Sequence, residues 1–432
     1  MKIIHYPNQK QLQEVLKRPA FEDKKLEKNV REIIQKVRIE GDQAIKEFSR
    51  RYDLVQVKDL GIPSEAISAS GKLISNELKE ALRVAAENIT NFHKAQIPEE
   101  IFVETILGVT CRQKPVPINK VGLYIPGGSA PLISTVLMLA IPARLAGCNE
   151  IILCTPPNRE GRIHPAILYA AKISGVTGIF SCGGAQAIAA MAFGTETISK
   201  TDKIFGPGNQ YVTLAKQIIA SQGIAIDMQA GPSEVMILAD ETANPEFIAA
   251  DLLSQAEHGP DSQVILVTNS KKIANQALIC LKNQLKAIPR KDLAIQSLKS
   301  GAIIIVNDEL EMVRLSNGYA PEHLILATKK NEELAEYITQ AGSVFLGNFT
   351  PESLGDYASG TNHTLPTNGF ARSYSGLNMD AYFKKITFQK ATRQGLISIG
   401  PIVERIAEAE QLQAHKNAIS VRLKSIINEN KN

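Results

Sequence analysis

Five short apolar segments lie between residues 119 and 234. Segments of helical character separate most of them. The apolar segments read KVGLYIP, EIILCTPP, TGIFSCGG, DKIFGPGN and AIDMQAGPSE, and glycine or proline stands at their ends. Strands that alternate with helices through short turns are typical of a parallel sheet with helical crossovers. A second series, with helices between its members, reads EVMILAD, QVILVT, GAIIIV, HLILAT and SVFLGN. The chain is therefore expected to belong to the α/β class, with two open, mostly parallel sheets.

Periodic segments outside the two series predict the remaining elements. Helical patterns extend over 23–52, interrupted at Gly41, over 76–94, and over 251–258, where Gly259 and Pro260 end the helix. IFVETILGVTCRQKPVPI predicts paired strands, KITFQKAT predicts a short strand, and residues 401–427 predict a long charged helix.

The expected domain organisation is discontinuous. Residues 21–120 and 235–378 are assigned to one α/β domain, and residues 121–234 to a second, both resembling an incomplete Rossmann fold. Residues 1–20 and 379–432 are expected to form small arms outside the main globule. Arms that extend past a globule are commonly exchanged between the subunits of a dimer.

Composition narrows the classes of function. The 432 residues carry a formal net charge of +4, and no dense Lys/Arg patch is interleaved with aromatic residues, which argues against nucleic-acid binding. The most apolar run, 130–146, contains two prolines and an arginine and is shorter than a membrane span. Five cysteines without a CxxC pair favour free thiols in the cytoplasm over disulfides or a thiolate zinc site.

Glycine-containing turns follow three strands of the first series. PGGSAP (with Gly127, Gly128 and Ser129), CGGAQA and GPGNQ would let a ligand approach the backbone at a helix N-terminus. None is a GxGxxG motif, and no acidic residue stands at the usual distance for a ribose, so ordinary turn chemistry remains an alternative. If a nucleotide binds here, it would meet Tyr124, Gln186 and Asn209 and would be held loosely.

The seven histidines fall into two groups according to their neighbours in the sequence. His5, His93 and His164 lie in charged or proline-flanked segments and are expected to be solvated. The other four have polar or acidic neighbours, in AEHGP, APEHLIL, GTNHT and LQAHKNA. The adjacent Glu322 and His323 of APEHLIL are a candidate acid–base pair.

Gln255 and His258 are three residues apart and would share one face of a helix. An amide oxygen beside an imidazole could bind a metal ion or a polar substrate, but a polar helix end with a dipole-stabilised histidine explains the pair equally well. Adding Asp356 and His415 would give a zinc-compatible set without thiolates. The sequence spacing supports only the first two.

Cys182, in FSCGG, is the residue that a thiohemiacetal mechanism would require. It precedes a helix start but has no basic neighbour to lower its pKa. Cys148 and Cys154 lie beside a strand and are expected to be core residues.

Eight segments in order resemble the signature segments of the histidinol dehydrogenase family. They are VGLYIPGGSAPL, GGAQAIAAMAFGT, KIFGPGNQYVTLAK, AGPSEV, DLLSQAEHGPDSQ, APEHL, GDYASGTNHTLPT and AHKNA, and they extend from Val121 to Ala418. No departure from the family pattern is visible at the site positions, although 158–164 resembles a loop of variable length.

The resemblance implies a zinc-containing, NAD-dependent homodimer that oxidises L-histidinol through L-histidinaldehyde to L-histidine. Carried over by position, Glu322 and His323 are the acid–base pair, and Tyr124, Gln186 and Asn209 bind NAD. The implied zinc ligands are Gln255, His258, Asp356 and His415, all of which also contact substrate together with His323. Ser233, His363 and Glu410 are the further substrate-binding residues that the resemblance implies. Tail exchange would place Glu410 and His415 in the partner subunit's site.

Two other functions remain to be weighed. One is a cysteine-dependent, NAD-linked aldehyde dehydrogenase acting through Cys182 or Cys148. The other is a metal- or nucleotide-binding regulatory protein that has lost catalysis, which the presence of Glu322, His323 and all four implied ligands disfavours.

Overall fold

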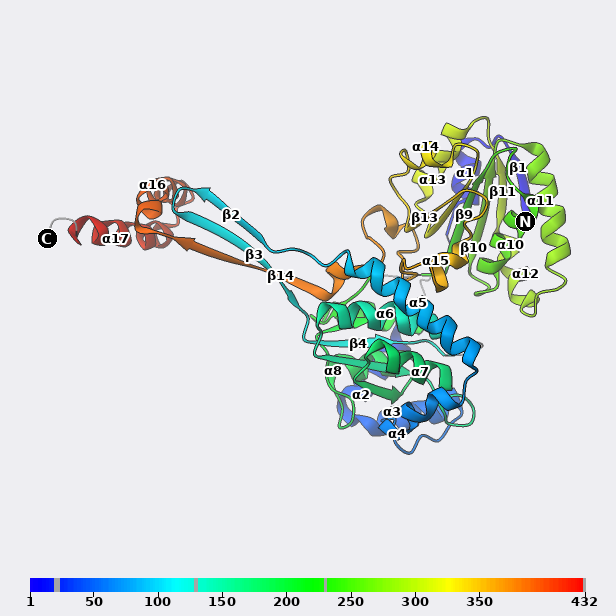
Figure 1. The fold of residues 1–432 in the computed structure, drawn as a ribbon, viewed down its shortest axis with the longest axis horizontal. Coiled ribbons are helices and arrows are strands. Elements are labelled where there is room, and N and C mark those ends of the chain that lie inside the picture. Colours follow the sequence, from blue (N-terminus) through cyan, green and yellow to red (C-terminus); the bar gives the residue numbers. More distant parts are fainter. Residues whose placement is uncertain (19–23, 128–130, 229–230, 430–432) are drawn as a thin grey trace. The chain divides into compact units, whose positions relative to one another are not determined.

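Two units of the chain can be distinguished in a computed structural model, which describes residues 1–18, 24–127, 131–228 and 231–429. The first unit comprises Met1–Gln96 and Ile118–Tyr382, and the second comprises Ile97–Pro117 and Phe383–Asn432. The first unit contains two parallel sheets with helices around them, and the second contains an antiparallel sheet and two helices (Figure 1). None of the described helices combines the length and the apolar character needed to cross a membrane.

A five-stranded parallel sheet is formed by the first strand series, as predicted. Its order is β6 (Gly178–Ser181), β5 (Glu150–Thr155), β4 (Lys120–Tyr124), β7 (Lys203–Phe205) and β8 (Ala225–Ile226). Helices α6 (Ile133–Ala146), α7 (Pro165–Ser174), α8 (Gly184–Phe193) and α9 (Gln210–Ala220) connect the strands. The strand order reverses between β4 and β7, and open α/β sheets bind ligands beside such a reversal.

The N-terminal helices pack on the helices that flank this five-stranded sheet, contrary to the assignment of residues 21–120 to the other α/β domain. They are α2 (Lys24–Glu40), α3 (Asp42–Phe48), α4 (Ser64–Ala69) and α5 (Asn76–Lys94). Val30 and Val37 of α2 belong to one buried cluster with Ala187 and Ala190 of α8. The small side chains of α8 permit this close packing, which helix periodicity alone could not assign to either sheet.

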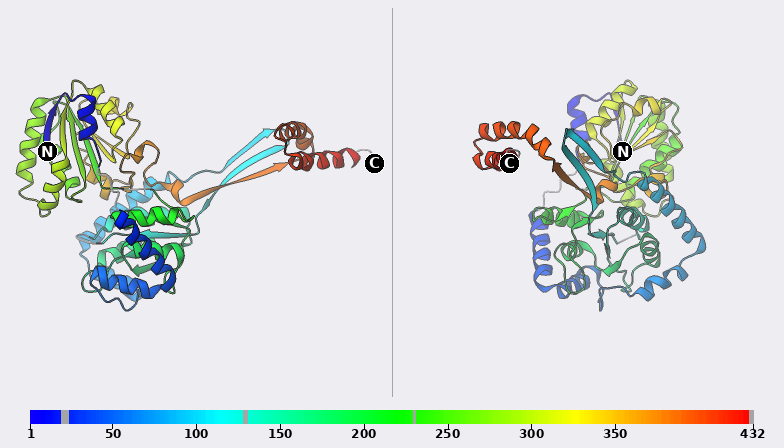
Figure 2. Two further views of the ribbon diagram at one scale, coloured as in Figure 1. Left: turned by 180° about the vertical axis from the view of Figure 1, so that it is seen from behind. Right: turned by 60° about the vertical axis from the view of Figure 1, so that its left-hand side comes forward.

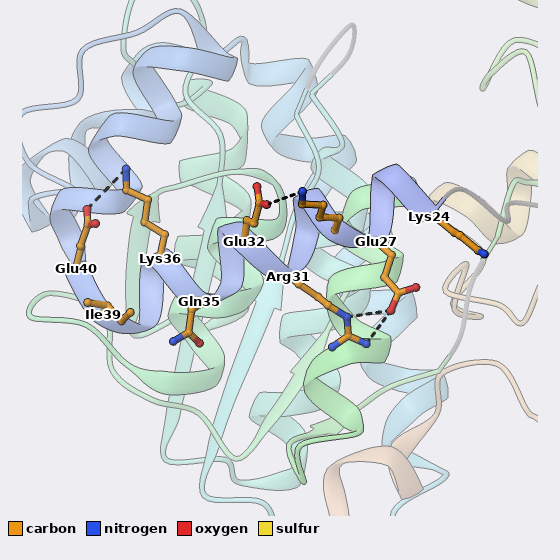
Figure 3. A pocket seen from close by; sticks show the side chains of 9 residues that line it. Lys24, Glu27, Arg31, Glu32, Gln35, Lys36, Ile39 and Glu40 are labelled. Carbon is orange, nitrogen blue, oxygen red and sulfur yellow. Dashed lines mark hydrogen bonds and ion pairs between the residues drawn. The ribbon is translucent and has the colours of Figure 1, made fainter.

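The outer face of α2 is charged and solvated. Figure 3 shows Arg31 paired with Glu27 and Lys36 with Glu40 along this face, with side chains that are partly or largely exposed. The opposite face buries Leu26, and the helix is therefore amphipathic in the manner expected of a surface helix.

The second series forms a six-stranded parallel sheet. Its order is β1 (Lys2–His5), β11 (Ala302–Ile305), β10 (Gln263–Thr268), β9 (Glu234–Ala239), β12 (His323–Ala327) and β13 (Ser343–Leu346). Val235 and Ile237 of β9 pack on one face and Met236 and Leu238 on the other, so both faces are buried. The accompanying helices are α1 (Gln9–Val15), α10 (Pro245–Ala256), α11 (Lys271–Gln284), α12 (Lys291–Ser300), α13 (Glu309–Tyr319), α14 (Asn331–Ala335) and α15 (Glu352–Tyr357).

The prediction that residues 1–20 form an arm outside the globule is wrong for the first strand. Strand β1 pairs in parallel with β11, with Ile3 opposite Ile303. KIIH is too short to be recognised as a strand, and only the exposed edge of β11 gives it a partner.

Helix α10 begins earlier and ends earlier than the predicted range 251–258. Asn244 caps its start, with Pro245 in the first turn, and the helix ends at Ala256. His258 therefore lies in the turn that follows, where its N–H donates to the Gln255 carbonyl oxygen at 3.3 Å.

The second unit is built on the predicted strand pair. Strands β2 (Ile101–Ile106) and β3 (Val109–Pro117) form an antiparallel hairpin, and β14 (Phe383–Ala391) pairs with β3 (Figure 2). The single helix predicted over 401–427 is instead two helices, α16 (Arg393–Ala409) and α17 (Gln413–Glu429). Pro401 lies inside α16, and the break follows at Gln411, whose φ is +61°.

Candidate active site

Glu322 and His323 lie at the start of β12, beside the start of the neighbouring strand β9. Glu322 is 6% exposed and His323 is 3% exposed. The Glu234 backbone N–H donates to Glu322 Oε2 at 2.8 Å, and the Glu234 carbonyl oxygen lies 3.0 Å from His323 Nδ1. One residue of β9 thus orients both members of the pair through its backbone.

The free nitrogen of His323 faces a carboxylate. Its Nε2 is buried 3.3 Å from Asp356 Oδ1, although no described atom meets hydrogen-bond geometry with it. If Nδ1 carries the proton and donates to the Glu234 carbonyl oxygen, Nε2 is left as a base. Nδ1 also lies 2.8 Å from Gln255 Nε2, so the opposite tautomer would accept a hydrogen bond from Gln255.

Burial and charge act differently on the two residues. Burial raises the pKa of the Glu322 carboxyl, and attraction to His323 offsets only part of that effect. Burial alone would lower the pKa of His323, but the surrounding carboxylates outweigh it and raise that pKa. On each member of the pair, burial and mutual attraction therefore act in opposite directions.

An ion pair with the partly exposed Arg18 holds the buried side chain of Glu234. Arg18 donates to both carboxylate oxygens of Glu234, at 2.6 and 2.8 Å, and also to the Tyr319 carbonyl oxygen at 2.9 Å. The guanidinium lies over the Tyr319 ring, 3.8 Å from its centroid, and the Asn368 N–H donates to Glu234 Oε1 at 3.0 Å. Glu234 is therefore held by both its side chain and its strand.

Gln255 projects from the last turn of α10 toward His323 and α15. Its Nε2 donates to Glu352 Oε2 at 3.3 Å, and Ser254 Oγ donates to Glu352 Oε1 at 2.5 Å. Glu352 is 1% exposed. Because both recorded contacts of the Gln255 amide use Nε2, its carbonyl oxygen remains available to a ligand.

The implied zinc ligands are divided between the two units. Gln255, His258 and Asp356 belong to the first unit, whereas His415 is exposed on α17 of the second. Within the described ranges, no group of three or more His, Cys, Asp or Glu residues lies close enough to hold a metal ion. The amide oxygen, imidazole and carboxylate of the first unit nevertheless fit a borderline divalent ion by donor type.

His363 is already engaged by the protein through both ring nitrogens. Nδ1 lies 2.8 Å from the Asp356 carbonyl oxygen, and Nε2 lies 3.1 Å from Thr135 Oγ1. Burial lowers the pKa of this imidazole, which favours the neutral ring. These contacts favour a role in positioning the segment of Asp356 over direct contact with substrate.

A cavity of about 800 Å³ brings several of the predicted residues together. Ser233, His258, Glu322 and His363 line it, together with Asn209 from the five-stranded sheet's α9. Glu410, which was also predicted to bind substrate, is exposed at the end of α16 in the second unit. The cavity is of ordinary size for a small polar ligand.

A second cavity, of about 920 Å³, is lined by all three residues predicted to bind NAD, Tyr124, Gln186 and Asn209. It lies at the carboxyl ends of β4 and β5, where Tyr124 and Pro156 line it. Gly206, after β7, has a φ of +128°, and a Cβ there would collide with the Tyr124 carbonyl oxygen. Asn209 caps α9, and the Tyr124 hydroxyl accepts from the Gly184 N–H at 3.0 Å. Gly128 and Ser129 of the first glycine turn, and Ala230 of AGPSEV, lie outside the described residues.

The cysteines do not support a thiohemiacetal mechanism. Cys182 is fully buried, and burial raises the pKa of its thiol well above the usual value. Burial likewise raises the pKa of Cys148 to about 12. A nucleophilic cysteine needs the opposite shift.

Sequence reasoning missed three residues of this neighbourhood and misplaced a fourth. Glu352 could have been found, because it stands four residues before Asp356 and so shares a helix face with it. Arg18 and Glu234 carry no local signal, because their partners are distant in sequence. His93, expected to be solvated, is buried, with Nδ1 2.9 Å from the Ile89 carbonyl oxygen.

The two parallel sheets and the buried Glu–His pair beside a cavity are features expected of an α/β enzyme. The model of the family described as histidinol dehydrogenase matches residues 16–423. The chain belongs to the histidinol dehydrogenase family and is an oxidoreductase.

Individual relatives agree with the family match over nearly the whole chain. Histidinol dehydrogenase from Bacteroides thetaiotaomicron is 56% identical over 426 residues, covering 99% of this chain and 100% of that protein. The Vibrio parahaemolyticus enzyme is 51% identical and covers 97% of each. The crystal structure of histidinol dehydrogenase from Elizabethkingia anophelis has a TM-score of 0.96 at 53% identity, covering 99% of this chain and 98% of that one.

One aldehyde dehydrogenase of known structure resembles this chain in fold. A salicylaldehyde dehydrogenase from Pseudomonas putida is 12% identical with a TM-score of 0.51, covering 82% of this chain and 90% of that one. This likeness concerns the fold alone, and together with the buried cysteines it leaves the cysteine-dependent alternative without support.

Proposed function

We propose that this protein oxidises L-histidinol through L-histidinaldehyde to L-histidine, reducing two NAD for each histidinol, as the last step of histidine biosynthesis. The observation that carries the proposal is the buried Glu322–His323 pair, of which Glu322 lines the cavity with Ser233 and His258. The printed names of the relatives point to the same substrate.

The residues have distinct roles in this reaction. NAD, held by Tyr124, Gln186 and Asn209, would accept a hydride in each oxidation. His323 Nε2 accepts the alcohol proton as the first hydride leaves, which gives the aldehyde. Glu322 takes a proton from water as it adds to the aldehyde. The protonated His323 returns its proton to the former aldehyde oxygen, which completes the hydrate. The hydrate then loses its hydride to a second NAD and a hydroxyl proton to the neutral His323, and becomes the carboxylic acid.

The proposed metal is zinc, held by Gln255, His258, Asp356 and His415 of the partner subunit. A zinc ion there would bind the amine and imidazole of histidinol and so orient the substrate. Ser233 and Glu410 of the partner subunit complete the proposed substrate contacts. The supporting features are the side-chain amide oxygen of Gln255, which makes no hydrogen bond within the described residues, and the mixed nitrogen and oxygen donor set.

We further propose a homodimer in which each site takes residues from both subunits. Exposed apolar side chains on the second unit, among them Phe102, Ile386 and Ile402, would be covered by such an association. A cytoplasmic location is proposed on the free thiols of the five cysteines.

Counting NADH tests the reaction. Metal-replete protein is incubated with limiting L-histidinol and excess NAD, and NADH is measured at completion. Two NADH per histidinol are expected. One would mean that the reaction stops at the aldehyde, and none would refute the function.

His323→Ala separates the proposed base from the metal site. The variant is expected to retain bound zinc, measured by atomic absorption, and to lose about 100- to 10,000-fold in kcat, the range for a missing general base. His258→Ala serves as the contrast, because it should lose zinc as well as activity. An unchanged kcat in His323→Ala would refute the role of this histidine.

A further inference from the structure

Asp53 is a carboxyl group in the cavity of Tyr124, Gln186 and Asn209 that the proposed chemistry does not use. Its Oδ2 is buried and lacks a hydrogen-bond partner in the part of the chain that the structure describes. The Ser49 hydroxyl lies close enough to lower the pKa of Asp53 through a hydrogen bond, but neither Ser49 Oγ nor Asp53 Oδ2 has a partner of good geometry among the described residues. A buried carboxylate oxygen without a partner requires an explanation.

The Asp53 carboxyl lies near the Tyr124 hydroxyl, and both residues line the cavity. Burial raises the pKa of Asp53. The Tyr124 hydroxyl has a pKa that is raised first by its own burial and further by the charge of Asp53. Asp53 therefore lies close enough to influence the tyrosine predicted to contact the cofactor.

Asp53 lies at the end of an irregular helical turn. The residue ends a single turn of π-helix, Ser49–Asp53, and such turns are often found at functional sites. Leu54 follows with a φ of +58°, which is unfavourable for a leucine, and its side chain is 78% exposed. This left-handed residue caps the turn, because the Leu54 backbone N–H donates to the Ser49 carbonyl oxygen.

The two cavities indicate which half of a dinucleotide would meet Asp53. Asn209 lines both cavities, which therefore adjoin each other at this residue. The nicotinamide must lie in the cavity of Glu322, where hydride transfer occurs. The adenosine half would then occupy the cavity of Asp53.

We propose that Asp53 accepts hydrogen bonds from the ribose hydroxyls of the adenosine half and thereby selects NAD over NADP. The inference rests on the proposed function, because it assumes that the dinucleotide occupies this cavity. A carboxylate can accept from two adjacent hydroxyls, and it repels a 2′-phosphate. At the end of β5, where such an acid usually stands, this chain has Pro156 and Pro157.

Glu160 is the other carboxylate of the cavity lining. It is exposed and forms an ion pair with Arg162, whose side chain is 75% exposed. Its charge is therefore already compensated, in contrast to that of Asp53.

The test compares cofactor choice in three single variants of the full-length, metal-replete protein. Asp53→Asn is compared with Glu160→Gln and with Asp59→Asn, an exposed acid of the same segment that does not line the cavity. The kcat/KM for NAD and for NADP is measured with saturating L-histidinol. Binding of each dinucleotide without histidinol is measured by titration calorimetry, which does not depend on turnover.

Asp53→Asn is expected to shift the NAD/NADP ratio of kcat/KM toward NADP by about 10- to 100-fold, with a parallel shift in binding. Asp59→Asn should retain the wild-type ratio. A ratio within twofold of wild type in Asp53→Asn, or a shift in Glu160→Gln instead, would overturn the assignment. Equal loss of both dinucleotides in a normally folded Asp53→Asn would also overturn it. A wild-type protein that reduces no NAD would refute the proposed function itself.

Discussion

The ion pair of Arg18 and Glu234 fixes the residue whose backbone orients Glu322 and His323. Glu234 contacts Glu322 and His323 only through its backbone, and its side chain is 3% exposed and held by Arg18. Removing one partner of such a pair leaves the other charge buried without compensation, which is far more costly than removing the pair as a whole.

Arg18→Ala is therefore expected to destabilise the fold by about 3–5 kcal/mol. Denaturant unfolding of metal-replete protein measures the change. Arg31→Ala is the matched control, because the Arg31–Glu27 pair is exposed and should contribute about 0–0.5 kcal/mol. Equal losses in the two variants would contradict the distinction drawn from burial.

At the scale of elements, helix α5 is fastened to the segment that carries Asp356 and His363. Asn88 donates to the Ala358 carbonyl oxygen at 2.9 Å, and His93 Nε2 lies 3.4 Å from Asn362 Nδ2. The neutral His93 ring fits this arrangement, with Nδ1–H donating to the Ile89 carbonyl oxygen and Nε2 accepting from Asn362. Protonation of Nε2 would abolish the second bond.

The buried His93 predicts a pH dependence of stability. Burial lowers its pKa from 6.5, so the unfolded chain binds the proton more readily than the folded one. Its contribution to stability is present above pH 6.5 and is lost as the pH falls through the folded pKa. His93→Gln should flatten the dependence of Tm on pH below about 6.5. His5→Gln, at an exposed histidine, is the control and should keep the wild-type dependence of Tm on pH. An unchanged dependence in His93→Gln would contradict the role of His93.

At the scale of the whole molecule, the proposed zinc ligands belong to different units of the chain. Gln255, His258 and Asp356 lie in the first unit and His415 in the second. If each site takes His415 from the partner subunit, two inactive variants can restore activity when they are mixed, which a site within one chain would not allow.

Complementation distinguishes the two arrangements. His258→Ala and His415→Ala should each be inactive alone. After dissociation and reassociation of a mixture, half the dimers are mixed, and each would hold one intact site of two, restoring about a quarter of wild-type activity. Mixing His258→Ala with Asp356→Ala should restore none. If the first mixture also stays inactive, each site is built within one chain.

The strand and helix alternation was sufficient to predict both parallel sheets, because hydrophobic runs of strand length between glycine and proline turns are a local property. The segment around Glu322 and His323 was likewise recognisable, since the pair is adjacent in sequence. Cap signals at Asn244 and Pro245 could have corrected the start of α10, because they too are local.

Only the tertiary structure decided which distant groups meet. It added KIIH to the six-stranded sheet, packed α2 against α8, buried His93 and placed Arg18 on Glu234. It also placed Asp53 in the cavity of Tyr124, although Asp53 precedes the five-stranded sheet and has none of the spacing of a dinucleotide motif. The sequence by itself determined the strands of both series and the Glu–His pair, because periodicity and adjacency act over a few residues. The charges and hydrogen bonds that orient that pair depend on chain segments that only folding brings together.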